Sequence, residues 1–164
     1  LMIAGLKKKP SQATYFTRPT CRDIRSLDGI PVLLPMHSKV IALSGIGNND
    51  SFFDGLATRY SVLHNIGFED HHHYLNTDVE LFTAAFEQNP EASFIITTEK
   101  DAVKLASLDS LPESLRGRIF YECIGMEFIP YNTDDSAAKV EDSLYELLDK
   151  EIKRFNDGTH IRGC

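Results

Sequence analysis

Apolar residues in the middle of the chain follow two alternating patterns. Short runs rich in β-branched and apolar residues predict buried strands, and apolar positions that recur every three or four residues predict amphipathic helices. The strand-like runs cover 39–44, 60–66, 93–98 and 118–124, the last with an extension over 126–129. The helix-like stretches cover 51–59, 76–88, 98–105 and 140–155. This alternation predicts an α/β fold, a mainly parallel sheet with helices on both faces.

The remaining segments are less regular. A strand is predicted over 13–17, a turn at Asp28-Gly29, and a loop over 108–117. The apolar stripe of 140–155 is typical of a helix face that packs against a core. A chain of 164 residues fits a single α/β domain over 1–164, with a disordered tail predicted over 156–164.

Composition narrows the possible functions. Apolar residues make up 42% of the chain, enough for a core, and 24 acidic against 17 basic residues give a net charge of -7. Such a chain is a poor non-specific binder of nucleic acid, so no nucleic-acid partner is expected. Three cysteines without a CxxC pair favour a reducing compartment. No run is long enough to span a bilayer and no signal peptide is visible, so a cytoplasmic location is expected.

Two polar segments follow strand-like runs, where open α/β sheets present their chemistry. In the first, 68–74, Asp70 precedes three histidines, His71, His72 and His73. A carboxylate beside His71 suits an acid–base pair, whereas three adjacent histidines in a loop cannot all face one metal ion. No metal site is therefore predicted, and a polar surface loop is the alternative interpretation.

The second polar segment covers 97–105. Thr98 with Asp101 forms a capping-box-like helix start, and Lys100 and Lys104 share one helix face. These residues suit either a phosphate-binding helix start or an ordinary capped helix.

A third segment, Gly45-Ile46-Gly47-Asn48, lies between a predicted strand and a predicted helix. It lacks the third glycine of a dinucleotide-binding loop and the Gly-Lys-Ser/Thr of a Walker A loop. A tight strand-to-helix turn is sufficient to explain it.

Taken in order, the three segments resemble the carboxyl-terminal half of the tetraacyldisaccharide 4'-kinase family, the lipid A kinases of Gram-negative bacteria. The resemblance rests on Ser44-Gly45-Ile46-Gly47-Asn48 followed by Phe52-Phe53, on Phe68-Glu69-Asp70-His71-His72-His73-Tyr74, and on Thr97-Thr98-Glu99-Lys100-Asp101-Ala102-Val103-Lys104-Leu105. It covers roughly 13–129. It implies one lobe of a P-loop NTPase-like kinase that transfers the ATP γ-phosphate, with Mg²⁺, to the 4'-hydroxyl of tetraacyldisaccharide 1-phosphate.

The resemblance also implies residue roles. His71 matches the histidine of the family's Asp-His pair, which works with a catalytic aspartate of the other lobe, and Asp70 matches the partner of that histidine in the pair. Substrate-side, phosphate-side or lobe-interface positions are implied for Gly45, Gly47, Asn48, Thr98, Lys100, Asp101 and Lys104. His73 and Asn49 stand where the family commonly has proline, and both changes are expected to affect loop stiffness more than chemistry.

Family members are about twice as long as this chain. Their amino-terminal half carries a membrane-associating segment, the Walker A loop, acidic metal-binding residues and a catalytic aspartate, none of which is found among these residues. The resemblance therefore implies that ATP and Mg²⁺ bind mainly to that missing lobe. It also implies that the partners are that lobe and the lipid A disaccharide precursor, and that the full-length protein associates with the cytoplasmic face of the inner membrane. The chain alone is expected to be inactive as a kinase.

Three other interpretations remain open at this point. The chain could be a stand-alone α/β module that binds a nucleotide or anion, a metallohydrolase that uses Asp70 and the histidines, or a purely structural domain.

Overall fold

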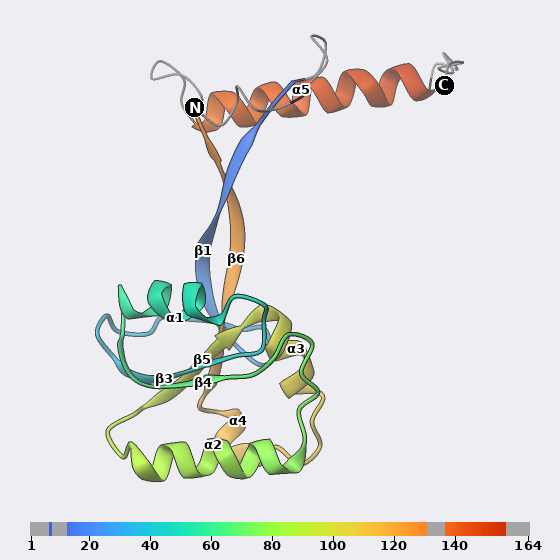
Figure 1. Cartoon of the computed structure of the whole chain (residues 1–164). Helices are drawn as coiled ribbons and strands as arrows, with labels where there is room; N and C mark the ends of the chain where they lie inside the picture. The colour runs from blue at the N-terminus through green and yellow to red at the C-terminus, as the bar shows by residue number, and fades with distance from the viewer. Residues whose placement is uncertain (1–6, 8–12, 131–136, 157–164) are drawn as a thin grey trace. The chain divides into compact units, whose positions relative to one another are not determined.

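The computed structural model describes residues 7, 13–130 and 137–156 (Figure 1). The strands in this part of the chain are β1 (Phe16–Ser26), β2 (Pro31–Val32), β3 (Lys39–Ser44), β4 (Ser61–Gly67), β5 (Phe94–Thr98) and β6 (Ile119–Ile129). The helices are α1 (Asn49–Ala57), α2 (Asn76–Gln88), α3 (Glu99–Ala106), α4 (Glu113–Arg116) and α5 (Ala137–Asn156). The predicted alternation of strands and helices from residue 39 onward is confirmed.

The strands form one six-stranded sheet in the order β2-β1-β6-β5-β3-β4. β3 is parallel to β4 on one side and to β5 on the other, and β5 is parallel to β6. β1 and β2 are antiparallel, so the sheet is mixed but mostly parallel, as predicted. The chain leaves β3 towards β4 and returns to β5 on the opposite side of β3. In such sheets the carboxyl ends of the strands at this reversal are where ligands bind.

Helices cover both faces of the sheet because alternate residues of the strands point in opposite directions. Ile41 and Leu43 of β3 belong to a buried cluster that includes apolar residues of α2, α3 and α4. Val40 and Ala42 belong to a second cluster, which includes Phe52 and Leu56 of α1. Figure 1 shows α1 and α2 on opposite sides of β3, β4 and β5. The prediction of helices on both faces is therefore confirmed.

The contacts divide the chain into two compact units, 21–125 and 1–20 with 126–164. The first unit contains the three polar segments identified in the sequence. In the second unit, Arg18 pairs with Glu127 at 2.8 Å and the ring of Tyr15 meets Phe128 edge-on. A single domain over 1–164 stays a prediction, and the predicted tail lies outside the described residues except for Asn156, the last residue of α5.

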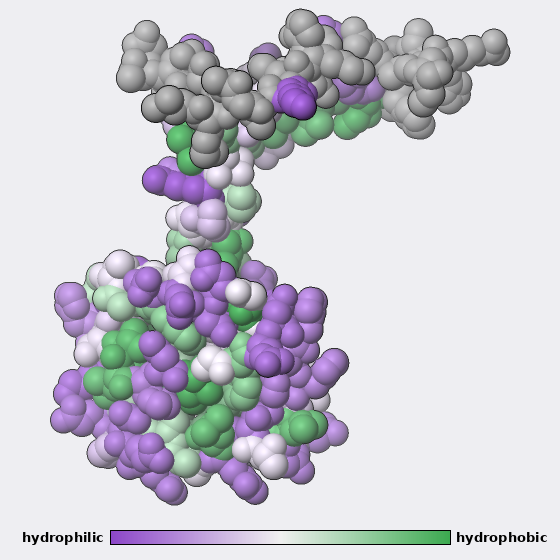
Figure 2. Space-filling view, viewed as in Figure 1, coloured by the Kyte–Doolittle hydropathy of each residue, from purple (hydrophilic) through white to green (hydrophobic). Residues whose placement is uncertain are grey.

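Three details differ from the predicted elements. β1 begins at Phe16, so only the last two residues of the strand predicted over 13–17 belong to it, and it continues to Ser26. The loop predicted over 108–117 contains the short helix α4. α5 forms as predicted, but Leu147, Leu148 and Ile152 of its apolar stripe are 37%, 46% and 56% exposed. Part of this stripe is visible in Figure 2 as hydrophobic surface along α5. The prediction that this part of the stripe packs into a core was wrong, because periodicity indicates an apolar face but not what covers it.

In the described part of the chain, no helix combines the length and the hydropathy that crossing a bilayer requires.

Candidate functional site

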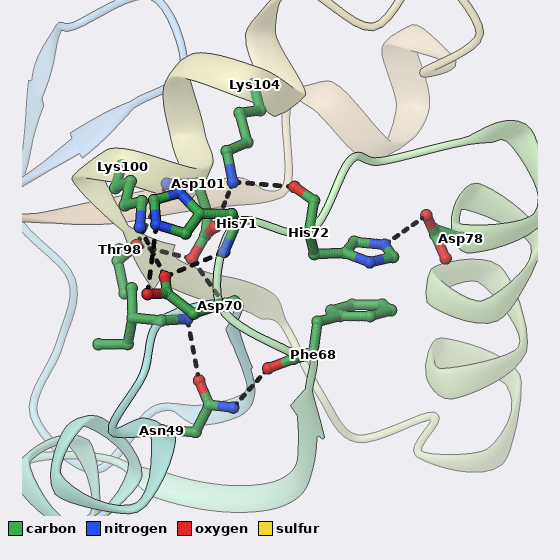
Figure 3. Close-up of polar contacts among 12 residues, drawn as sticks. Asn49, Phe68, Asp70, His71, His72, Asp78, Thr98, Lys100, Asp101 and Lys104 are labelled. Atoms are coloured by element: carbon green, nitrogen blue, oxygen red, sulfur yellow. Dashed lines mark hydrogen bonds and ion pairs between the residues drawn. The ribbon is translucent and has the colours of Figure 1, made fainter.

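The three polar segments meet at one edge of the sheet. β4, β3 and β5 are neighbours and parallel, so the segments that follow them leave from the same edge. Residues of the Gly45 turn, of the loop after β4 and of α3 are joined by hydrogen bonds there (Figure 3). The sequence suggested each segment separately, and the parallel arrangement of the strands is what brings them together.

Asp101 joins the start of α3 to the turn after β3. Its carboxylate is completely buried, and Oδ2 accepts hydrogen bonds from the Thr98 hydroxyl at 2.7 Å and from the Gly45 N–H at 2.9 Å. The Asp101 N–H in turn donates to Thr98 Oγ1 at 3.2 Å. The predicted helix start at Thr98 is thus confirmed, and the same carboxylate also fixes the Gly45 turn.

The glycines of this turn allow close approach of polar groups. A Cβ atom on Gly45 would lie 3.1 Å from Asp101 Oδ1 and 3.3 Å from the Tyr74 hydroxyl. A Cβ atom on Gly47 would lie 3.7 Å from Asp70 Oδ2. Burial, with the Asp101 carboxylate nearby, raises the pKa of Tyr74, so its hydroxyl stays protonated.

Asn48 and Asn49 hold the turn in place. Asn48 Oδ1 accepts from the Ser51 N–H at 3.2 Å and so caps α1. Asn49 Oδ1 accepts from the Ile46 N–H at 3.2 Å, and its Nδ2 donates to the Phe68 carbonyl at 2.7 Å. From the sequence, Asn49 was expected only to affect the stiffness of the loop. The structure shows that its amide ties the turn after β3 to the end of β4.

Both lysines of α3 are directed at the loop after β4. Lys100 Nζ donates to Asp70 Oδ1 at 2.7 Å, and Lys104 Nζ donates to the His72 carbonyl at 2.8 Å. Lys104 Nζ also lies 3.8 Å from Asp101 Oδ1. Both ammonium groups therefore have partners within the chain.

The charges at this edge bear on the binding of phosphate and of metal ions. The carboxylate of Asp70 lies against Gly47, so the turn that could have cradled phosphate faces a negative charge. Asp70 itself is paired with Lys100, which opposes a second cation at the same carboxylate.

His71 is the exposed member of the histidine run. Its backbone has φ 65°, in the left-handed region, and its side chain is 80% exposed. The His71 N–H donates to Asp70 Oδ1 at 2.9 Å, and its Nε2 lies 3.5 Å from Asp70 Oδ2. The hydrogen bond from Lys100, with the charges of His71 and Lys100, holds the pKa of Asp70 below its ordinary value. An ionised carboxylate therefore lies beside an imidazole that is open to a ligand.

His72 has a different environment, which the sequence pattern did not indicate. Its ring stacks on Phe68 with centroids 4.1 Å apart and planes at 15°, and its Nε2 lies 2.9 Å from Asp78 Oδ2 (Figure 3). Asp78 Oδ2 also accepts the Leu75 N–H at 2.8 Å, at the start of α2. The only sequence signal for this pairing was the aspartate in the first turn of the next helix.

The histidines of the run do not converge on one point. His71 pairs with Asp70, His72 pairs with Asp78, and His73 is exposed. Within residues 7, 13–130 and 137–156, no group of three His, Cys, Asp or Glu side chains is arranged to hold a metal ion.

Comparisons with known proteins give one consistent family. The sequence model of the LpxK family, described as "Tetraacyldisaccharide-1-P 4'-kinase", matches residues 7–145. A tetraacyldisaccharide 4'-kinase of Phocaeicola vulgatus is 31% identical over 126 residues, which cover 73% of this chain and 34% of that protein. One of Desulfatibacillum aliphaticivorans is 40% identical over 113 residues, which cover 67% of this chain and 27% of that protein.

A solved structure supports the fold. A crystal structure of LpxK from Aquifex aeolicus in complex with ATP matches 88% of this chain and 39% of its own, with a TM-score of 0.51 and 18% identity. The chain thus spans about a third or less of the length of the curated relatives it matches.

Proposed function

Because the chain belongs to the LpxK family of tetraacyldisaccharide-1-P 4'-kinases, we propose that it is the carboxyl-terminal lobe of such a kinase. The reaction proposed for the whole protein is transfer of the ATP γ-phosphate to the 4'-hydroxyl of tetraacyldisaccharide 1-phosphate in lipid A biosynthesis. For that protein we propose a place at the cytoplasmic face of the inner membrane.

The observation that carries this proposal is the exposed imidazole of His71 beside the Asp70 carboxylate, at the carboxyl edge of β4, β3 and β5. Neutral His71 can accept the proton of an attacking sugar hydroxyl. Asp70 can orient the ring and stabilise the imidazolium that forms. General-base assistance of this kind contributes on the order of 10²–10⁴-fold in rate.

The residues around this pair would shape one wall of the catalytic cleft. Gly45 and Gly47 allow the turn to approach the carboxylates, and Asn48 fixes the helix that follows it. Thr98, Asp101 and Lys104 hold the other side of the same edge. Their proposed role is to set the shape of the site on the substrate side.

ATP and Mg²⁺ are proposed to bind mainly outside this chain, on the amino-terminal lobe of the same kinase. The negative charge against the Gly45–Asn48 turn and the internal pairing of Lys100 support this assignment. Phosphoryl transfer depends mostly on positioning and on charge stabilisation around the phosphate. This chain by itself is therefore expected to transfer no phosphate.

The test compares the chain alone with the complete kinase that contains it, using radiolabelled ATP and tetraacyldisaccharide 1-phosphate. We expect turnover only from the complete protein. Turnover by the isolated chain would contradict the division of roles between the lobes.

A thermal-shift measurement on the isolated chain separates this proposal from a stand-alone nucleotide-binding module. A ligand at 100 times its dissociation constant stabilises a protein by about 2.7 kcal/mol. The lobe assignment predicts no such shift with millimolar ATP and Mg²⁺, and a clear shift would favour the binding module. Stoichiometric zinc or manganese in protein purified without a metal column would instead favour a metallohydrolase.

A further inference from the structure

The backbone conformation of His71 requires an explanation. Its φ of 65° lies in a region that non-glycine residues rarely occupy. Such a residue persists there only when its surroundings hold it, and residues of this kind gather at functional sites. The contacts around His71 therefore indicate what positions its ring.

Asp70 contacts His71 at two points. Its Oδ1 accepts the His71 N–H at 2.9 Å, which fixes the backbone, and its Oδ2 lies 3.5 Å from Nε2 of the ring. Asp70 is itself exposed in part, so a freely rotating carboxylate would make neither contact reliably. Lys100 contacts the same carboxylate, because its Nζ donates to Oδ1 at 2.7 Å from the first turn of α3.

We propose that Lys100 is a positioning residue for His71, which it orients through Asp70, and that it does not bind phosphate. Lys104, one turn further along α3, holds the same loop at the His72 carbonyl. The two lysines thus fasten the loop after β4 to α3 on both sides of His71. The expected effect of Lys100 on turnover rests on the proposed kinase function. Its expected effect on the position of His71 does not.

Lys100 acts by fixing the position of the Asp70 carboxylate, because it is not needed to keep that carboxylate charged. The ordinary pKa of an aspartate is about 3.9, so Asp70 is ionised at neutral pH with or without Lys100. Removal of Lys100 therefore leaves the carboxylate charged but free to turn. A misplacement of about 1 Å at a reacting group can lower turnover on the order of 10²-fold.

A double-mutant cycle in the complete kinase tests the inference, with Lys100→Met, Asp70→Asn and the combined variant. We expect Lys100→Met at pH 7.5 to lower kcat by about 10- to 10²-fold while KM for ATP stays unchanged. Lys100→Arg should restore most of kcat because it can donate to the same oxygen. In the Asp70→Asn background, Lys100→Met should have little further effect, since the two residues act as one unit.

The rival role makes the opposite predictions. If Lys100 binds phosphate, Lys100→Met raises KM for ATP. In the combined variant, its effect then multiplies with that of Asp70→Asn. Either result overturns the inference.

A measurement on the isolated chain keeps the structural part testable even if the kinase proposal fails. In ¹⁵N-labelled protein, Lys100→Met should shift the His71 amide signal and speed its hydrogen exchange, whereas Lys100→Arg should not. Lys39→Met is the matched control, because Lys39 forms a similar ion pair with Glu91 at the opposite end of β3. It should leave the His71 amide unchanged. An unchanged His71 amide in Lys100→Met would overturn the inference whatever the activity of the enzyme.

Discussion

The Asp101 carboxylate is the contact on which the geometry of the site most depends. It is completely buried, and it accepts from two donors that come from different segments, Gly45 and Thr98. Asp101→Ala leaves both donors buried without their partner. A hydrogen bond to a charged group contributes about 1.5–3 kcal/mol, so the two together predict a loss of roughly 3–6 kcal/mol in the free energy of unfolding. This is a large fraction of the roughly 5–15 kcal/mol by which most domains are stable.

Urea denaturation of the purified chain measures this loss, and hydrogen exchange at the Gly45 amide locates it. Asp101→Asn keeps one acceptor oxygen and should lose less, about 1–3 kcal/mol. Asp54→Ala, at an exposed position of α1, is the control and should stay within about 0.5 kcal/mol of the parent. The reasoning is refuted if Asp101→Ala costs less than about 1 kcal/mol, or if the Gly45 amide keeps its protection.

Further expectations concern the same edge of the sheet. Gly45→Ala should destabilise the chain by about 1–3 kcal/mol in urea denaturation, because its Cβ meets two oxygens, whereas Gly55→Ala in α1 meets nothing and should stabilise it by about 0.4–1 kcal/mol. The pKa of Asp70 is lowered in the folded state, so its contribution to stability is present above the unfolded value of about 3.9 and is lost as the pH falls through the lower folded value. The stability difference between the parent and Asp70→Asn should therefore shrink on acidification, and a constant difference would contradict this. His72→Ala should cost about 1–3 kcal/mol through lost stacking and hydrogen bonding, and His73→Ala at most about 0.5 kcal/mol; equal effects would show that the His72 contacts contribute nothing.

Local signals in the sequence were sufficient to predict the strands and helices that surround the site. The run over 39–44 is β-branched and apolar and ends at a glycine, and β3 has these bounds. Thr98 and Asp101 have the spacing of a helix start, and both form the predicted cap. These features depend on residues a few positions apart, which is why periodicity and capping chemistry reveal them.

Contacts between segments could not be predicted in the same way. The lysine spacing on α3 showed that Lys100 and Lys104 share a face, but not that this face meets the loop after β4. Nor did three consecutive histidines indicate that His72 would turn to Asp78 while His71 stayed exposed. Such partners are set by strand order, which depends on the packing of the whole sheet.

The order of strands also explains why separate motifs form one site. β3 lies between β4 and β5, so the segments that follow these strands must emerge side by side. The sequence placed each polar segment after a strand-like run, and the parallel pairing of these strands in the structure explains why the segments meet.

The central proposal is that His71 helps to deprotonate the sugar hydroxyl in a lipid kinase. The most direct test measures kcat for phosphorylation of tetraacyldisaccharide 1-phosphate by the complete kinase with His71→Gln, alongside His73→Gln at the neighbouring exposed histidine. The account predicts that His71→Gln lowers kcat on the order of 10²–10⁴-fold and that His73→Gln leaves it close to the parent value. Unaltered turnover in a folded His71→Gln enzyme, or an equal loss in both variants, would contradict it.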